Sequence, residues 1–193
     1  MVRTPAGFRF PRGAACGIVT VSPLEPSMTR PLAAVAALFL LAPAASAQDM
    51  PLSQILIDGE GWVKLDGPWN HISRPGAVVE SPDRSAEFSW QPGETFLHAR
   101  QLPKGVRAPY APLRVPAGAQ PKVTELAADR DGRIYAATPI GVQVYDPTGR
   151  LCGVVASPVL GAGVDLMWFQ GDQLVVAVGG TRYTRKLRTA GAS

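Results

Sequence analysis

The sequence has little of what most catalytic or cross-linked sites are built from. Its 193 residues include two cysteines and two histidines, and neither a G-x-S-x-G nucleophile motif nor a phosphate-binding P-loop occurs. From residue 75 onward, no stretch of ten residues has a helical hydrophobic period. These absences exclude the commonest nucleophile and phosphate signatures and a helical bundle. The 20 glycines, 19 prolines and 46% hydrophobic residues instead favour a turn-rich β protein.

An export signal precedes the main part of the chain. It consists of a short positive segment at residues 28–30, an apolar stretch at residues 32–42 and a small-residue cleavage site, Ala-Ser-Ala, at residues 45–47. The apolar stretch is shorter than the roughly 20 residues that span a bilayer as a helix. We therefore predict a signal peptide of residues 28–47, cleaved between Ala47 and Gln48. The protein would be secreted or periplasmic, with no membrane span after cleavage; a retained anchor is the alternative.

Residues 1–27 show neither a hydrophobic period nor capping signals, and Met28 stands where a signal peptide should begin. We expect Met28 to be the true start and residues 1–27 to be an upstream extension from a misplaced start.

Most of the positive charge lies in this leader. Residues 1–47 hold four arginines and one glutamate, so they contribute +3 of the net charge of +4 and leave +1 on the remaining 146 residues. That balance predicts no nucleic-acid partner. Cys16 also lies in the leader, so Cys152 is left alone and an intramolecular disulfide is excluded.

Nine segments rich in β-branched, aromatic and apolar residues lie between turn residues and are predicted to be strands. They are residues 87–90, 95–98, 122–128, 133–137, 141–145, 151–156, 164–169, 173–178 and 182–187. Residues 112–115 are expected to add an outer strand. Residues 52–65 read as a strand, an Asp-Gly-Glu-Gly turn and a second strand, which would form a terminal strand or cap.

The strands recur in one order. Three units share an apolar strand, an acidic turn, a second strand, a small-residue turn and a third strand, and their acidic turns carry Asp83, Asp131 and Asp172. The spacings of 48 and 41 residues match the roughly 40 to 50 residues of a four-stranded propeller blade. We therefore predict an all-β fold, a partial β-propeller of about three four-stranded antiparallel blades in residues 75–193. An N-terminal strand or cap segment, residues 48–74, would precede it. A sandwich or small barrel is the alternative.

One stretch resembles a known family. The run Asp129-Arg130-Asp131-Gly132 followed by RIYAATPIGVQVYDPTGRLCGVV is similar to a late blade of the gluconolactonase, senescence-marker-protein and luciferin-regenerating-enzyme family. The opening PLSQILIDGEGW and the turn Ser81-Pro82-Asp83 also resemble members of that group. The resemblance touches most of the chain after the leader. It implies a six-bladed propeller with calcium or zinc in its central channel, and hydrolysis of sugar lactones or related esters.

The resemblance also implies where the metal ligands should lie, and the sequence departs from the pattern at each place. Asp66 stands where the family has a glutamate, in a motif that is one residue short. The asparagine position falls on Gly76, and the aspartate position falls on Thr124, which is followed by Glu125 where glycine is expected. Glycine has no side chain to coordinate a metal, and a threonine hydroxyl cannot act as a carboxylate base near neutral pH. We expect the family's metal site to be absent or rebuilt, with Asp66 as its remaining candidate ligand and no catalytic residue assigned.

The length leads to the same expectation. Six blades of roughly 40 to 50 residues need about 240 to 300 residues, and the 146 residues after the leader supply three at most. An incomplete propeller exposes blade edges, which invite association. Either the chain associates with another copy of itself, or its blades pack in another closed way, or it is a remnant of a longer gene.

Other candidate sites have simpler interpretations. Asp129-x-Asp131-Gly132 lacks the further ligands of a calcium loop and is expected to be a hairpin turn. His71 and His98 have no partners at zinc-ligand spacing. Cys152 lies in an apolar strand and is expected to be a buried, inert thiol.

Three functions remain open at this point. The first is a secreted metal-dependent hydrolase whose substrate is a sugar lactone or another small ligand. The second is a non-catalytic exported binding or assembly module that keeps the blades without the site. The third is a remnant of a longer gene.

Overall fold

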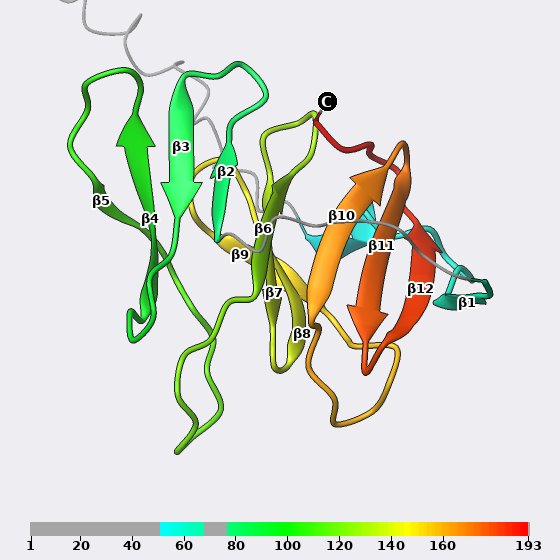
Figure 1. Cartoon of the computed structure of the whole chain (residues 1–193). Coiled ribbons are helices and arrows are strands. Elements are labelled where there is room, and N and C mark those ends of the chain that lie inside the picture. The colour runs from blue at the N-terminus through cyan, green and yellow to red at the C-terminus, as the bar shows by residue number, and fades with distance from the viewer. Residues whose placement is uncertain (1–50, 68–76, 193) are drawn as a thin grey trace, which may run out of the picture. The chain divides into compact units, whose positions relative to one another are not determined.

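The computed structural model describes residues 51–67 and 77–192, which form three four-stranded antiparallel sheets (Figure 1). The predicted signal peptide, its cleavage site, the upstream extension and Gly76 lie outside the described residues. Within the described ranges, no helix has the length and apolar composition needed to cross a membrane. The predicted all-β fold of three four-stranded blades is confirmed.

Each sheet takes its strands mainly from one stretch of chain. In spatial order, the first sheet contains β2 (Val78–Glu80), β3 (Ala86–Ser89), β4 (Phe96–Gln101) and β5 (Ala108–Pro112). The central sheet contains β6 (Glu125–Ala128), β7 (Ile134–Thr138), β8 (Gly141–Tyr145) and β9 (Leu151–Val155). The third sheet contains β10 (Leu166–Gln170), β11 (Gln173–Val178), β12 (Thr181–Lys186) and β1 (Val63–Leu65). A short 3-10 helix, η1 (Leu52–Gln54), precedes β1.

The three acidic turns fall at equivalent places. Asp83 lies between β2 and β3, Asp131 between β6 and β7, and Asp172 between β10 and β11. In the first of these turns, Asp83 Oδ1 accepts hydrogen bonds from the Ser85 backbone N–H at 3.0 Å and from the Ser81 hydroxyl at 2.6 Å. An aspartate that bonds its own backbone two residues on is a favoured turn former. The repeat in the sequence therefore corresponds to the repeat of the sheets.

The central sheet is covered on both faces. All five residues of β7 and all five of β8 are buried. Ile134, Ala136 and Tyr145 pack into a core shared with the first sheet. The alternate residues pack into a second core, shared with the third sheet; they include Tyr135, Ala137, Val142 and Val144. Because successive strand residues point to opposite faces, a strand covered on both sides is apolar at most positions; the exceptions, Thr138 and Gln143, are hydrogen-bonded.

Polar contacts also fasten the first sheet to the central one. The Gln143 side chain, fully buried in β8, accepts from the Arg114 backbone N–H and donates to the Arg114 carbonyl, both at 2.8 Å. The Tyr110 hydroxyl of β5 donates to the Asp146 carbonyl after β8. Paired buried polar groups of this kind fix one arrangement of the two sheets.

The N-terminal segment ties the central and third sheets together. Its strand β1 pairs with β12, so Val63 faces Thr184 and the third sheet gains its fourth strand from the start of the described chain. The Arg188 backbone N–H donates to the Ile55 carbonyl at 2.8 Å, and the Trp62 indole donates to the Ala156 carbonyl beyond β9 at 2.8 Å. This clamp, residues 51–65, contacts elements from both sheets.

Some predicted boundaries were wrong. The outer strand of the first sheet is β5, not residues 112–115, because the Leu113 N–H makes the last bond toward β4, to the Thr95 carbonyl at 2.9 Å, and the Arg114 backbone bonds to the Gln143 side chain instead. The predicted strand at the start of residues 52–65 is the helix η1 with a single bridge from Leu56 to Leu187. The second strand of that segment exists as β1.

Substitution of Gly149 tests the contact between the first and central sheets. It has a positive φ of 87°, and an added Cβ would collide with the Tyr110 carbonyl oxygen of β5. We expect Gly149→Ala to lower the free energy of unfolding by about 3 kcal/mol, from the cost of positive φ and the clash together. Gly161→Ala is the matched control, because Gly161 has φ of 76° and open space around it; its cost should be about 1 kcal/mol. Urea denaturation measures both, and equal losses would contradict the tight contact.

Candidate functional site

The inner strands of the three sheets lie side by side, with β6 between β2 and β10. The residues at the start of these strands are where the family resemblance places metal ligands. Thr124, just before β6, donates its hydroxyl hydrogen to the Val164 carbonyl at 2.8 Å. The next residue, Glu125, is 8% exposed, and its Oε2 accepts from the Met167 backbone N–H of β10 at 3.0 Å. Both side chains therefore bond the central sheet to the third sheet.

Asp66 lies elsewhere. It follows β1, the outer strand of the third sheet, whereas Thr124 precedes an inner strand. Asp66 is exposed, and its carbonyl oxygen accepts from Arg182 Nη2 at 3.4 Å. The fold does not bring Asp66 and Thr124 into one site. Across residues 51–67 and 77–192, no group of three or more His, Cys, Asp or Glu side chains could hold a metal ion, so the described residues do not fit the metal that the resemblance implies.

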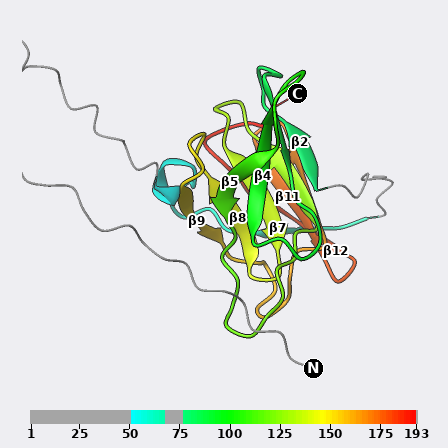
Figure 2. The ribbon, with the colours of Figure 1, turned by 90° about the vertical axis from the view of Figure 1, so that its left-hand side faces the viewer.

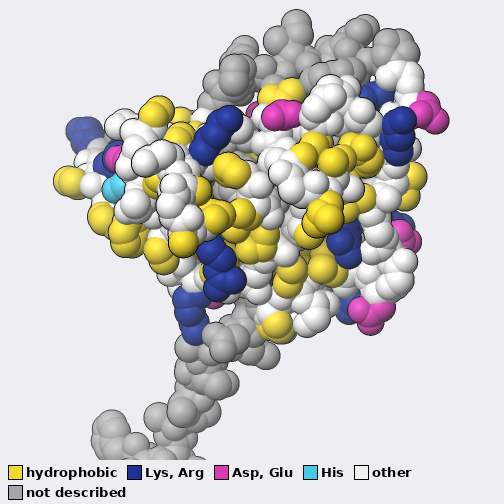
Figure 3. Space-filling model, turned by 90° about the horizontal axis from the view of Figure 1, so that it is seen from below, with side chains coloured by type: hydrophobic (Ala, Val, Ile, Leu, Met, Phe, Trp, Pro, Cys, Tyr) yellow, Lys and Arg dark blue, Asp and Glu magenta, His cyan; other side chains and the backbone are white. Residues whose placement is uncertain are grey.

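Figure 3 shows the lower end of the molecule of Figure 1, from which β6 and β10 begin. Hydrophobic and basic side chains gather on this face, and acidic side chains lie toward its margin. A small hollow here is lined by Arg114 and Lys122 together with apolar residues such as Ile140. Calcium and magnesium prefer carboxylate and carbonyl oxygens, so the chemistry of this face does not favour a cation.

The turn that resembles a calcium loop is closed by its own contacts. Asp129 is fully buried, and its Oδ1 accepts from the Arg133 backbone N–H at 2.9 Å. Its Oδ2 accepts from Arg133 Nη1 at 2.9 Å and from the Tyr135 hydroxyl at 3.0 Å. Burial, and next the Asp129 carboxylate, raise the pKa of Tyr135. These bonds occupy the carboxylate, and the turn joins β6 to β7 as the predicted hairpin.

A hollow of about 380 Å³ opens between the first and central sheets at the acidic turns. Asp83 and Asp131 line it, but each carboxylate already accepts hydrogen bonds within its own turn or from Arg133. Hydrogen bonds from the Ser81 hydroxyl, and then from the backbone N–H and the hydroxyl of Ser85, lower the pKa of Asp83 to about 2. The acidic groups of this hollow are structural.

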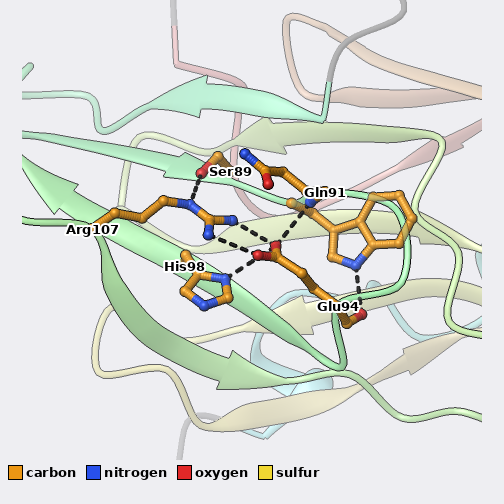
Figure 4. Close-up of polar contacts among 6 residues, drawn as sticks. Ser89, Gln91, Glu94, His98 and Arg107 are labelled. Carbon is orange, nitrogen blue, oxygen red and sulfur yellow. Dashed lines mark hydrogen bonds and ion pairs between the residues drawn. The ribbon is translucent and has the colours of Figure 1, made fainter.

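A polar cluster on the first sheet was not predicted (Figure 4). Glu94, in the turn between β3 and β4, receives two hydrogen bonds from Arg107, at 2.7 and 2.6 Å. His98 Nδ1 lies 3.3 Å from Glu94 Oε2, and Arg107 Nε donates to the Ser89 hydroxyl oxygen at 3.2 Å. Ser89 and His98 are direct cross-strand neighbours, but Ser89 accepts a bond from Arg107 instead of donating to the imidazole. The cluster therefore lacks the nucleophile–base contact of a catalytic triad.

The Arg107 hydrogen bonds lower the pKa of Glu94 to about 2, and the Gln91 backbone N–H acts in the same direction. Glu94 also accepts the Trp90 indole hydrogen through its backbone carbonyl at 2.8 Å. These contacts close the turn between β3 and β4. No local sequence motif indicates this cluster, because Arg107 is 13 residues from its partner Glu94.

The remaining thiol is also unsuited to catalysis. Cys152 in β9 is half-buried, and burial, followed by the nearby Asp146 carboxylate, raises its pKa. The thiolate is the reactive form, so its fraction at neutral pH is small.

The sheets and their adjacent inner strands define a segment of a β-propeller. No protein-family profile matches the sequence, and no curated protein matches it. Solved structures do match. The fold is similar to regucalcin, a calcium-binding protein from Agrobacterium tumefaciens, with 16% identity and a TM-score of 0.50 over 62% of this chain and 47% of that chain.

A protein assigned as a gluconolactonase matches at 21% identity and a TM-score of 0.50, over 62% of this chain and 40% of that chain. A gluconolactonase from Xanthomonas campestris matches at 24% identity and a TM-score of 0.49, over 58% of this chain and 37% of that chain. The chain thus spans less than half the length of these structures. The two structures with a TM-score of 0.50 belong to the group that the sequence resembles, and at these identities the likeness establishes the fold alone.

Glu125 provides a test of the bond between inner strands. Glu125→Ala leaves the Met167 N–H without its acceptor, so we expect a loss of about 1 to 3 kcal/mol in the free energy of unfolding. Glu125→Gln keeps an acceptor oxygen and should lose less than half as much. Denaturant unfolding of both variants measures the difference; equal losses would contradict the hydrogen-bonding role.

The Glu94–Arg107 pair predicts a pH dependence. Because folding lowers the pKa of Glu94 from 4.5 to about 2, its contribution is complete above the unfolded value and disappears as pH falls toward 2. Wild type should therefore exceed Glu94→Gln in Tm at pH 6, with the gap narrowing from about pH 5 downward. When both proteins also carry Arg107→Gln, the Tm difference made by Glu94→Gln should no longer narrow as the pH falls. A Tm difference between wild type and Glu94→Gln that stays constant from pH 6 to pH 2 would show that the ion pair has no such pH-dependent contribution.

Proposed function

We propose that this chain is an exported, non-hydrolytic module built of gluconolactonase-type propeller blades, whose role is binding or assembly. The observation that carries the proposal is the use of Thr124 and Glu125. In an enzyme of this group, the start of the inner strand would present a metal ligand to the channel. Here both side chains bond to the backbone of the neighbouring sheet, at Val164 and Met167.

The physical cost of converting this arrangement into a metal site supports the proposal. The Thr124 hydroxyl would have to leave the Val164 carbonyl, and the buried Met167 N–H would have to lose its Glu125 acceptor. Each buried polar group left without a partner costs about 1 to 3 kcal/mol. Asp66 cannot compensate, since it lies at the far edge of the third sheet, roughly 14 Å across three strand spacings.

The competing function is metal-dependent hydrolysis of a lactone. It is favoured by the similar structures, one a calcium-binding regucalcin and another assigned as a gluconolactonase. Those names describe whole proteins about twice as long as the aligned part. Such chemistry needs a metal with an open position and a separate proton acceptor, and among the described residues no group of three or more His, Cys, Asp or Glu side chains could hold that metal.

The two functions predict different rates of lactone hydrolysis. Purified protein should hydrolyse an aldonolactone no faster than the buffer blank, and calcium, zinc or a chelator should leave that rate unchanged. Hydrolysis is followed with a pH indicator, and the protein's Tm is measured in the same buffers to show that it is folded.

Thr124→Val is the matched variant. If Thr124 only bonds the sheets, this change lowers Tm and leaves the rate at the blank value. A wild-type rate that rises with metal, falls with chelator and disappears in Thr124→Val would overturn the proposal.

A further inference from the structure

Three connections between strands meet at the lower end of Figure 1. They are residues 113–124 before β6, the turn between β7 and β8, and residues 156–165 between β9 and β10. Hydrogen bonds join them near their bases: the Val164 backbone N–H donates to the Thr138 carbonyl at 3.2 Å, and the Val164 carbonyl accepts from the Thr124 hydroxyl at 2.8 Å. The parts that project beyond these bonds therefore start from one common base.

Two of the connections contain turns of the same type. In residues 116–119 and in residues 159–162, the backbone N–H of the fourth residue donates to the carbonyl of the first, at 3.0 and 3.1 Å. The third residue of each turn is a glycine with φ of 76°, which is typical of a type II turn. Ala117 and Leu160 occupy the second position, at the corner of each turn. The loop that carries Ala117 projects furthest from the sheets (Figure 2).

The side chains at these corners are apolar and face water. Ala117 is exposed, Leu160 is fully exposed and its neighbour Val159 is 37% exposed. Turn geometry does not require them, because turns favour Gly, Pro, Asn, Asp and Ser. A leucine that is wholly in water stabilises nothing within its own chain, whereas its transfer into an apolar environment is favourable.

The charges on the same loops are positive. Residues 113–124 include Arg114 and Lys122, both exposed, and neither this loop nor residues 156–164 contain Asp or Glu. Asp165 follows just before β10, and its carboxylate accepts from the backbone of the β11–β12 turn at 2.8 Å. With that carboxylate counted, one positive charge remains in excess on these loops.

We propose that this end of the chain rests on the surface of an anionic lipid bilayer. Val159 and Leu160 enter the boundary between headgroups and acyl chains, and Arg114 and Lys122 meet the phosphate groups. The contact lies on the membrane and does not span it. The inference goes beyond the proposed function, because the contact would hold whether or not the protein hydrolyses a lactone.

The order of apolar and charged side chains favours a lipid surface. Arg114 precedes the turn of residues 116–119 and Lys122 follows it, so the uncharged tip lies beyond the two cations. Apolar groups a few ångströms deeper than basic groups are what the interface of an anionic membrane accommodates.

The shape of this end argues against a protein partner. Stable protein interfaces use about 20 to 30 residues a side, and the projecting part here consists of two four-residue turns. A rigid partner would need a separate pocket for each corner, whereas fluid lipid adapts to both. Because few side chains enter the bilayer, we expect weak and reversible binding.

A tryptophan placed at each end of the sheets measures which end meets lipid. Leu160→Trp puts an indole at the lower end, and Val106→Trp puts one at the opposite end, where Val106 is 86% exposed between β4 and β5. The full chains are mixed with vesicles of phosphatidylglycerol and phosphatidylcholine whose acyl chains carry bromine, which quenches an indole that enters the bilayer. Quenching beyond that of wild type is expected in Leu160→Trp alone.

The leader is a necessary control, because its apolar stretch could itself bind vesicles. Both variants carry the same leader, so the difference between them reports on the position of the sheets. No extra quenching in Leu160→Trp, or equal extra quenching in both variants, would overturn the proposal. Tm values equal to that of wild type show that both variants are folded.

Paired substitutions test the two cations. In the Leu160→Trp chain, Arg114→Gln with Lys122→Gln should raise the lipid concentration at half-maximal quenching about 20-fold, since each basic residue near an anionic surface contributes a factor of roughly 5. Lys104→Gln with Arg130→Gln is the matched control, because it removes the same charge from the opposite end. That pair should leave the midpoint unchanged, and equal shifts for the two pairs would overturn the proposal.

A second copy of the chain is the alternative occupant of this end. Sedimentation equilibrium without lipid distinguishes it. A dimer that Leu160→Ser dissociates and Val106→Ser does not would show that another copy covers the turns, and would overturn the proposal. A lipid-free monomer whose Leu160→Trp indole is quenched on vesicles supports it.

Discussion

Burial of both faces of the central sheet is the constraint on which the rest of the structure depends. β7 and β8 have no polar face to turn toward water, apart from the satisfied Gln143 and Thr138. A sheet of this kind is stable only between two others. The first and third sheets supply that cover, each through one of its faces.

The N-terminal clamp stabilises the third sheet, which is one of the two sheets that cover the central one. A three-residue strand such as β1 has little stability alone, yet its pairing with β12 completes the third sheet and brings Ile55 into the core with Leu187. Residues 51–65 are therefore fastened to residues 182–188, across more than 100 residues of the chain. The inner strands receive a corresponding reinforcement from Thr124 and Glu125, and the proposed non-hydrolytic function rests on these two bonds.

Much of the fold could be predicted from local pattern. β8 and β11 begin and end where the sequence places them, because apolar runs bounded by Gly and Asp turns allow little else. The strand β5 was misplaced, since Pro and Gly leave its boundaries undefined. The pairing of β1 with β12 could not be foreseen, because strand pairing over such a separation has no local signal. At the candidate site, the resemblance pointed to Thr124, but the partner of its hydroxyl is a backbone carbonyl 40 residues away. The Glu94–Arg107 cluster likewise joins residues that no spacing rule connects.

The central claim is that the inner-strand side chains stabilise the sheets and do not hold a metal. A thermal shift measured with calcium, with zinc and with chelator tests this most directly, because a ligand that binds only the folded state raises Tm, and raises it further as the ligand concentration increases. The account predicts one Tm in all three buffers. A Tm that rises with increasing calcium or zinc and returns to the starting value with chelator would contradict it.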